Sequence, residues 1–248
     1  MKRYGVLALF ISLTLACVSA CVEVIPPSPS LAPAEAPQAA VEPFLRGFSI
    51  IPDSEESAVG CLLTEHRELI GSAVLISKWH ILTAGHCLDK TEAYWFKTNG
   101  KEYHICEQIF HPFYKLNGVL VYDIAMGVLE TECEETPYTL PGARVLYFQG
   151  KLLTAVGYGG GIRKKSDYGT IWYYGTLEES PKYFKMLPTH GTIWFGDSGG
   201  ALLDSDRVLV GISSSMQARR GILFENSAIR VDRFMEWINL VMKENPRE

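Results

Sequence analysis

The sequence predicts an all-β domain, either a barrel or a sandwich, behind an N-terminal fifth of a different kind. Short apolar runs recur along the chain between Gly, Pro, Asn or charged residues, a pattern typical of strands joined by turns. The runs lie at residues 70–76, 103–110, 124–129, 152–158, 171–177 and 208–212. A C-terminal helix is predicted from the spacing of Val231, Phe234, Trp237, Ile238 and Val241, with Asp232 as its N-cap.

Residues 1–20 have the pattern of a signal peptide. Lys2 and Arg3 precede an apolar run over residues 6–18, which is too short to span a bilayer. The segment Val18-Ser19-Ala20-Cys21 resembles the lipobox of bacterial lipoproteins, which implies that Cys21 becomes the acylated first residue of the mature protein. The alternative is an ordinary secretory signal cut after Ala20, which leaves Cys21 as a free thiol.

Residues 21–43 are rich in Pro and Ala and hold almost no large apolar side chain, so they predict an extended tether. One folded domain follows at residues 44–248. The sequence thus predicts export across the inner membrane and a lipid anchor, in the periplasm or at the cell surface. The whole chain has a formal charge of −5. Because Lys2 and Arg3 are lost with the signal, the mature chain is more acidic still, which argues against a nucleic-acid partner.

Three segments carry the chemistry: Thr83-Ala84-Gly85-His86-Cys87, Tyr122-Asp123-Ile124-Ala125 and Gly196-Asp197-Ser198-Gly199-Gly200. A hydroxyl is a poor nucleophile unless an imidazole takes its proton, and the imidazole needs a carboxylate to orient it. His86, Asp123 and Ser198 supply these three groups, in the order His, Asp, Ser.

With these motifs, residues 44–242 resemble a trypsin/chymotrypsin-family serine protease. Residues 71–79 resemble the strand before the histidine loop, residues 208–214 the strand after the nucleophile, and residues 230–238 the closing helix. The resemblance implies two antiparallel six-stranded β-barrels with the active site between them. It also implies a serine endopeptidase that acts through an acyl-enzyme, with Ser198 as nucleophile, His86 as general base and acid, and Asp123 orienting the imidazole.

The resemblance assigns further roles around Ser198. The backbone N–H groups of Gly196 and Ser198 would form the oxyanion hole. Asp197 would pair with a newly liberated amino terminus and so order the oxyanion turn. An acylated Cys21 has no free amine, so either cleavage between residues 46 and 50 frees one or another group substitutes for it.

Substrate preference is expected to differ from that of trypsin. The pocket-base position is Thr192, which offers no anion to a substrate Arg or Lys, and Met216 aligns with the pocket rim. Ser214 belongs to the strand whose backbone would hold an extended substrate. The cysteine that braces this wall in relatives is replaced by Trp194. Small or medium uncharged side chains are therefore expected, unless the loop is displaced and Met216 points away.

Four cysteines remain outside the first 21 residues, an even number that suits an oxidising compartment. In relatives the cysteine after the catalytic histidine bonds one in the preceding strand, a position that falls near Gly71 here. A hairpin turning near His66 would set Cys61 opposite Gly71, which predicts the pair Cys61–Cys87. The pair Cys106–Cys133 would join neighbouring strands, and four free thiols remain the alternative.

Neither a cofactor nor a metal is expected, because the histidines lack ligand spacing and no phosphate-binding glycine motif occurs. Peptide or protein substrates, a membrane contact through Cys21 and a monomeric state are predicted. Two alternatives stay open: a catalytically silent, surface-tethered binding module on the same scaffold, and a hydrolase that acts on esters alone.

Overall fold

The computed structural model describes residues 49–89, 93–116, 119–120, 122–142, 150–160, 164–174, 183–190, 193–219 and 223–247. All of them belong to one compact unit, which extends over residues 37–248. The predicted signal peptide at 1–20, the tether at 21–43, Cys21 and Thr192 lie outside the described residues.

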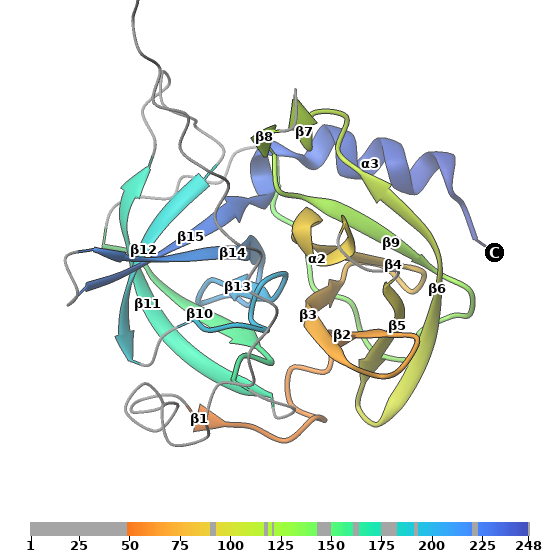
Figure 1. The fold of residues 1–248 in the computed structure, drawn as a ribbon, viewed down its shortest axis with the longest axis horizontal. Coiled ribbons are helices and arrows are strands. Elements are labelled where there is room, and N and C mark those ends of the chain that lie inside the picture. The colour runs from red at the N-terminus through yellow and green to blue at the C-terminus, as the bar shows by residue number, and fades with distance from the viewer. Residues whose placement is uncertain are drawn as a thin grey trace, which may run out of the picture. The chain divides into compact units, whose positions relative to one another are not determined.

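The first half of the described chain forms a closed six-stranded barrel, which lies to the right in Figure 1. Apolar residues in its strands alternate between two faces, so one set fills the barrel and the other faces the second sheet. In barrel order the strands are β2 (Val59–Thr64), β3 (Leu69–Leu75), β4 (His80–Thr83), β9 (Ala125–Leu129), β6 (Lys101–Phe110) and β5 (Ala93–Thr98).

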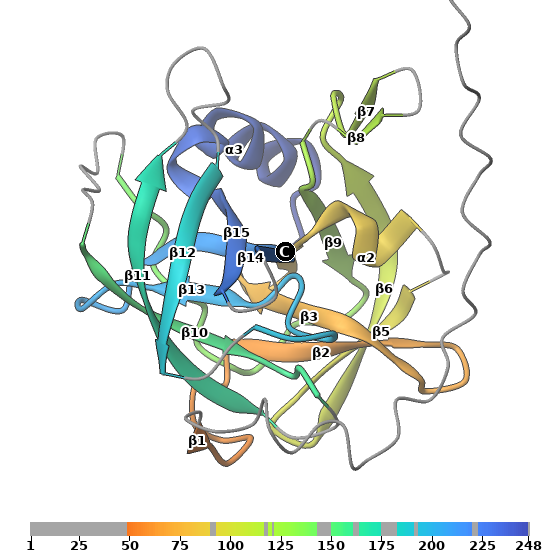
Figure 2. The ribbon, with the colours of Figure 1, turned by 60° about the vertical axis from the view of Figure 1, so that its left-hand side comes forward.

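The second half, joined by β1 from the start of the described chain, forms a seven-stranded antiparallel sheet that curls round on itself. In sheet order its strands are β1 (Ser49–Ile50), β11 (Lys165–Tyr174), β10 (Leu152–Gly157), β13 (Ala201–Leu203), β14 (Leu209–Arg219), β15 (Leu223–Arg230) and β12 (Tyr183–His190). An additional pairing between β11 and β12 brings the two sides of the sheet together and leaves β1 outside. Figure 2 shows this curled sheet beside the barrel. A small hairpin, β7 (Lys115–Leu116) and β8 (Val119–Leu120), completes the strands.

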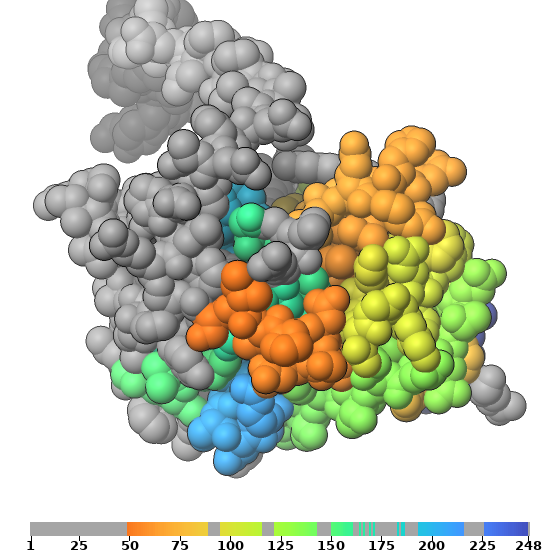
Figure 3. Space-filling model, turned by 90° about the horizontal axis from the view of Figure 1, so that it is seen from below, coloured from red at the N-terminus to blue at the C-terminus, as the bar shows by residue number. Residues whose placement is uncertain are grey.

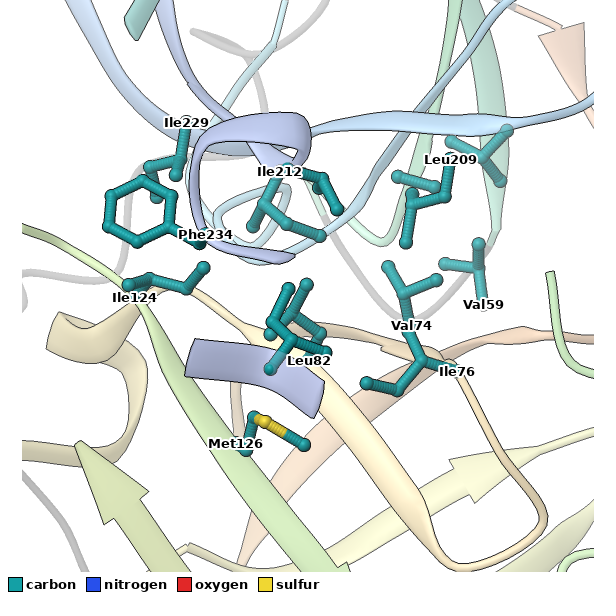
Figure 4. Packing of buried hydrophobic residues seen from close by; sticks show 14 of the residues in the cluster. Val59, Val74, Ile76, Leu82, Ile124, Met126, Leu209, Ile212, Ile229 and Phe234 are labelled. Carbon is teal, nitrogen blue, oxygen red and sulfur yellow. The ribbon is translucent and has the colours of Figure 1, made fainter. Parts of the chain in front are cut away.

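The largest apolar cluster lies between the two halves. Figure 4 shows side chains of the second sheet, among them Leu209, Ile212 and Ile229, facing Val74 and Leu82 of the barrel. All five are fully buried. Each such side chain stabilises the fold by about 1.5–3 kcal/mol, so this cluster holds the two halves together.

The C-terminal helix α3 (Met235–Glu244) follows a short 3₁₀ turn, η2 (Val231–Arg233). Ile238 and Val241 are its buried residues, as the helical spacing predicted. The expected N-cap at Asp232 is wrong, because α3 starts at Met235 and its N-cap residue is Phe234, which makes no side-chain cap. The Asp232 carboxylate instead accepts two hydrogen bonds from the Arg230 guanidinium, at 3.1 and 2.8 Å. None of the helices within the described ranges combines the length and the apolar character needed to cross a membrane.

The predicted architecture is confirmed: a mostly β chain with a closed six-stranded barrel, a curled sheet and one C-terminal helix. Each predicted apolar run overlaps a strand, although β11 starts six residues before the run at 171–177 and β14 extends well beyond residue 212. Residues 175–177 of that run lie outside the described residues. Sequence patterns fix strand positions better than strand ends.

The predicted Cys61–Cys87 disulfide is wrong, because both thiols are free in the part of the chain that the structure describes. Cys61 pairs with Ser72, and Leu62 pairs with Gly71. A shift of one residue in register moves a side chain to the opposite face of a strand. Cys61 therefore faces the junction cluster, whereas Cys87 lies with the residues inside the barrel.

The predicted Cys106–Cys133 disulfide is also wrong, since both of these described cysteines are free. Cys106 is exposed and sits at an irregularity of β6 between Ile105 and Glu107. Cys133 is fully buried inside the barrel. The two residues thus lie on opposite sides of the barrel wall, so no bond can join them without a change of backbone path.

Lys164 is almost fully buried and anchors the segment that precedes β2. Its ammonium donates hydrogen bonds to the backbone carbonyls of Asp53 at 2.9 Å, Glu55 at 3.1 Å and Glu56 at 3.2 Å. Glu56 also pairs with Arg207. Figure 3 shows this segment, in orange, on the surface beside the blue turn around residue 205.

Candidate active site

His86 and Asp123 are joined by two hydrogen bonds. Asp123 Oδ2 lies 2.7 Å from His86 Nδ1, and Asp123 Oδ1 accepts the backbone N–H of His86 at 2.8 Å. His86 lies in the short helix α2 (Gly85–Asp89), directly after β4, and Asp123 comes just before β9, which pairs with β4. The pairing of these two strands brings the two residues together, and their double contact fixes the orientation of the imidazole ring.

The two groups shift each other's pKa in the directions that favour an ion pair. Burial by itself lowers the pKa of His86, but hydrogen bonds and charge from Asp123, together with Cys87, outweigh it and hold that pKa above its ordinary value. Burial by itself raises the pKa of Asp123, but hydrogen bonds from His86 and Ser214 and the charge of His86 hold it below its ordinary value. Asp123 therefore stays ionised and stabilises a protonated His86.

Ser214 links Asp123 to Ser198. Its hydroxyl donates to Asp123 Oδ2 at 2.5 Å, and its backbone carbonyl accepts the hydroxyl of Ser198 at 2.9 Å. Among the described residues, Ser198 Oγ makes this bond and none to His86. The three predicted residues thus gather around Ser214, and proton transfer to His86 requires the Ser198 side chain to rotate away from the Ser214 carbonyl.

A further contact on Asp123 comes from Tyr183, which sequence reasoning missed. The Tyr183 hydroxyl accepts the backbone N–H of Asp123 at 3.1 Å. Tyr183 is the first residue of β12, so this bond ties the second sheet to the Asp123 segment. A tyrosine in a strand carries no sequence signal for such a role.

The turn before Ser198 presents two backbone N–H groups. Gly196 has φ +98°, a conformation that side chains other than glycine rarely adopt. The Phe195 carbonyl accepts the Gly160 N–H at 2.9 Å, so the Gly196 N–H of the same peptide unit points the other way. Within the described ranges, neither Gly196 N–H nor Ser198 N–H donates to a protein group. Both remain available to a ligand.

Asp197 is buried and bound to the backbone. Its Oδ2 accepts the Trp194 N–H at 2.7 Å, and its Oδ1 accepts the Gly159 N–H at 2.6 Å. A Cβ on Gly159 would lie 2.0 Å from Asp197 Oδ2, so only glycine fits there. Ile50 pairs with Lys165 in the β1–β11 ladder and is 56% exposed. The candidate for a new amino terminus is thus held in a strand at the surface.

The predicted specificity residues are only partly described. Ser214 is buried in β14, whose backbone continues through Met216, the partner of Asn226 in β15. The side chain of Met216 and the whole of Thr192 lie outside the described parts. Phe195, which sequence reasoning did not single out, is 80% exposed beside the oxyanion turn.

Comparison with protein families matches residues 52–238 to the family described as Trypsin. The match covers about three quarters of the sequence. The chain belongs to the trypsin family. A search of curated proteins finds no match.

Solved structures of this family share the fold at low sequence identity. Neuropsin, a serine protease expressed in the limbic system of mouse brain, is 20% identical, with a TM-score of 0.67 over 79% of this chain and 98% of its own. Human heparin binding protein is 17% identical, with a TM-score of 0.66 over 82% of this chain and 98% of its own. An inactivated protease paralogue of the scabies mite is 19% identical, with a TM-score of 0.66 over 80% of this chain and all of its own. Because a serine protease and an inactivated protease paralogue share this architecture, the fold alone does not decide activity.

Proposed function

We propose that the chain is a serine endopeptidase in which Ser198 attacks the scissile carbonyl. The observation that carries the proposal is the double contact of Ser214, which binds the His86-bound oxygen of Asp123 and also the hydroxyl of Ser198. One residue thereby holds the nucleophile next to the His86–Asp123 pair. Catalytic hydrogen bonds are often incomplete without substrate and tighten when it binds.

In the proposed reaction Ser198 Oγ forms a bond to the carbonyl carbon while its proton passes to His86. Asp123 stabilises the resulting imidazolium. The Gly196 and Ser198 N–H groups, which have no protein acceptor among the described residues, bind the oxyanion of the tetrahedral intermediate. His86 then protonates the leaving amine, and water releases the acyl group by the same steps. Loss of one oxyanion donor costs about 10²–10³ in rate in comparable sites.

The alternative function is a binding module that keeps the scaffold without activity. It is favoured by the orientation of the Ser198 hydroxyl, which donates to the Ser214 carbonyl and, among the described residues, makes no hydrogen bond to the His86 imidazole. A fluorophosphonate probe separates the two functions, because it reacts with an activated serine. We expect labelling of the full chain and none of Ser198→Ala. Absence of labelling and of peptide cleavage would favour the binding module, and turnover of esters alone would indicate an esterase.

The substrate preference follows from the sequence alignment of the pocket. Thr192 supplies no carboxylate, so we propose cleavage after small or medium uncharged side chains rather than after Arg or Lys. A library of peptides that vary the residue before the scissile bond measures this preference. Strong cleavage after Arg or Lys would overturn the alignment.

We further propose that the oxyanion turn forms without proteolytic activation. The Asp197 carboxylate is already bound by the Trp194 and Gly159 amides, and β1 pairing holds Ile50 at the surface. N-terminal sequencing of the active species tests this. Activity that appears only after cleavage within residues 46–50 would favour the alternative, in which a freed amine reaches Asp197.

We propose that the protein acts outside the cytoplasm as a lipid-anchored monomer, on the sequence pattern of residues 1–43. Mass spectrometry of the mature amino terminus measures acylation of Cys21. A free thiol at Cys21 would indicate secretion without an anchor.

A further inference from the structure

Ser72 lies in the centre of β3 and is completely buried. Its hydroxyl donates to the Gly196 carbonyl at 2.7 Å and accepts the Tyr158 N–H at 3.0 Å. This carbonyl belongs to the same residue as the Gly196 N–H, which is a candidate oxyanion donor. A side chain of the barrel therefore binds the oxyanion turn, which connects β12 to β13 of the second sheet.

The backbone of Ser72 binds the same region. Its N–H donates to the Ser198 carbonyl at 2.8 Å, and its carbonyl accepts the Thr83 hydroxyl at 2.7 Å. A Cβ on Gly199 would lie 2.0 Å from the Ser72 carbonyl oxygen. Strand β3 and the turn are therefore packed with no space for an intervening side chain.

These bonds fix the peptide units on both sides of Gly196. The preceding unit is held by the bond from Gly160 N–H to the Phe195 carbonyl at 2.9 Å. The following unit is held on its carbonyl side by the Ser72 hydroxyl and on its N–H side by the bond from Asp197 N–H to the Trp194 carbonyl at 2.9 Å. Glycine has little intrinsic resistance to rotation about φ and ψ. The direction of the Gly196 N–H thus depends on these flanking hydrogen bonds, of which the bond from Ser72 is the one supplied by a side chain of the barrel.

We propose that Ser72 is a positioning residue for catalysis, which acts through Gly196 by keeping its N–H directed at the oxyanion. The expected effect on kcat rests on the proposed peptidase function. The expected effect on the order of the turn rests on the hydrogen bonds alone. Without the hydroxyl, the Gly196 carbonyl and the Tyr158 N–H both lose a buried partner, and the turn gains freedom where the transition state needs a fixed donor.

The test compares Ser72→Ala with Thr98→Val in the full chain. Thr98 is also completely buried in the barrel, and its hydroxyl donates to the Ser57 carbonyl at 2.5 Å. Thr98→Val therefore also removes one buried hydroxyl, but at a site away from the oxyanion turn. We expect Ser72→Ala to lower kcat for a peptide substrate by about 10–100-fold with KM changed less than about twofold, and Thr98→Val to leave kcat unchanged.

Amide hydrogen exchange supplies a readout that needs no activity. Peptides covering residues 193–200 should exchange at least about tenfold faster in Ser72→Ala than in the parent, and equally fast in Thr98→Val and the parent. If Ser72→Ala does not fold, Ser72→Cys, which keeps a weak donor at the same Cβ, should show the same changes to a smaller extent.

The outcomes separate this proposal from the proposed function. An active parent whose kcat survives Ser72→Ala would overturn the positioning role, even if exchange at residues 193–200 became faster. A parent that neither reacts with a fluorophosphonate nor cleaves peptides would refute the peptidase function. In that case amide exchange at residues 193–200 decides alone. Faster exchange in Ser72→Ala than in the parent would support the proposal that Ser72 orders the turn, and unchanged exchange would overturn it.

Discussion

The sulfur of Cys87 lies next to the position that a Cβ atom on Gly71 would occupy. A Cβ built on Gly71 would be 2.7 Å from Cys87 Sγ and 3.3 Å from Cys87 Cβ. The predicted partner, Cys61, faces the other side of the same sheet. Cys87 is thus a buried thiol directed at a position that a glycine leaves empty.

Gly71→Cys is therefore expected to form a disulfide with Cys87. The expected Cβ and Sγ separations are close to those of disulfides, and the closed loop of about 17 residues predicts a gain of about 3 kcal/mol. Loss of free thiol on oxidation and a higher Tm than under reducing conditions would measure the bond. Gly71→Cys with Cys87→Ala is the control. An oxidised variant that keeps both thiols would contradict the prediction.

Asp123→Asn should lower both activity and the pKa that governs it. His86 acts as a base only when neutral, and Asp123 holds its pKa above the ordinary 6.5. We expect the activity of the parent to rise with pH at a midpoint above that value. In Asp123→Asn the midpoint should fall and kcat should decrease by about 10⁴. An unchanged midpoint would mean that the Asp123 charge does not control His86.

The same pair should stabilise the fold over a defined pH window. The raised pKa of His86 adds stability that is complete below 6.5 and is lost as pH rises through its value in the folded protein. The lowered pKa of Asp123 adds stability that is complete above 3.8 and is lost as pH falls through its value in the folded protein. The difference in unfolding free energy between Ser198→Ala and Ser198→Ala/Asp123→Asn should therefore peak between pH 3.8 and 6.5.

Gly199→Ala should be far more damaging than Gly100→Ala. Both glycines have positive φ, +86° and +76°, so both substitutions strain the backbone by about 1–2 kcal/mol. A Cβ on Gly199 would lie 2.0 Å from the Ser72 carbonyl oxygen, whereas a Cβ on Gly100 meets nothing within 4 Å. Denaturant unfolding measures the difference, and equal losses would show that the turn can move away from β3.

Lys164→Met should loosen the segment before β2. Three backbone carbonyls lose their buried donor, which costs about 1–3 kcal/mol. Limited proteolysis within residues 51–58 should become faster, while Lys101→Met, at an exposed position, should have no effect. Unchanged proteolysis in Lys164→Met would show that other contacts hold the segment.

The buried ammonium should also give the parent a pH dependence that Lys164→Met lacks. Burial lowers the pKa of Lys164 from 10.5 to about 8, against the opposing charge of Asp53. Between these values the unfolded chain holds a proton that the folded chain has released, so stability attributable to this group rises with pH. If the difference in unfolding free energy between the parent and Lys164→Met did not change with pH over that interval, the lowered pKa of Lys164 would be contradicted.

Sequence patterns located part of the strands and supplied the candidate residues of the site. Apolar runs separated by turn residues marked the positions of β3, β6, β9, β10, β11 and β14, because burial imposes that composition on a strand with a packed face. The histidine, aspartate and serine motifs identified His86, Asp123 and Ser198, since a hydroxyl nucleophile requires those chemical groups. The order of these motifs led to the trypsin family, which the family comparison confirms.

Only the tertiary structure decided which side chains and backbone groups contact each other. The register that sets Cys61 opposite Ser72 rather than Gly71 removed a predicted disulfide, and a pairing difference of one residue leaves almost no trace in composition. The bond from Ser198 to the Ser214 carbonyl and the hold of Ser72 on Gly196 join residues that are far apart in the sequence. Local pattern determined which groups are present, and long-range strand pairing determined which of them touch.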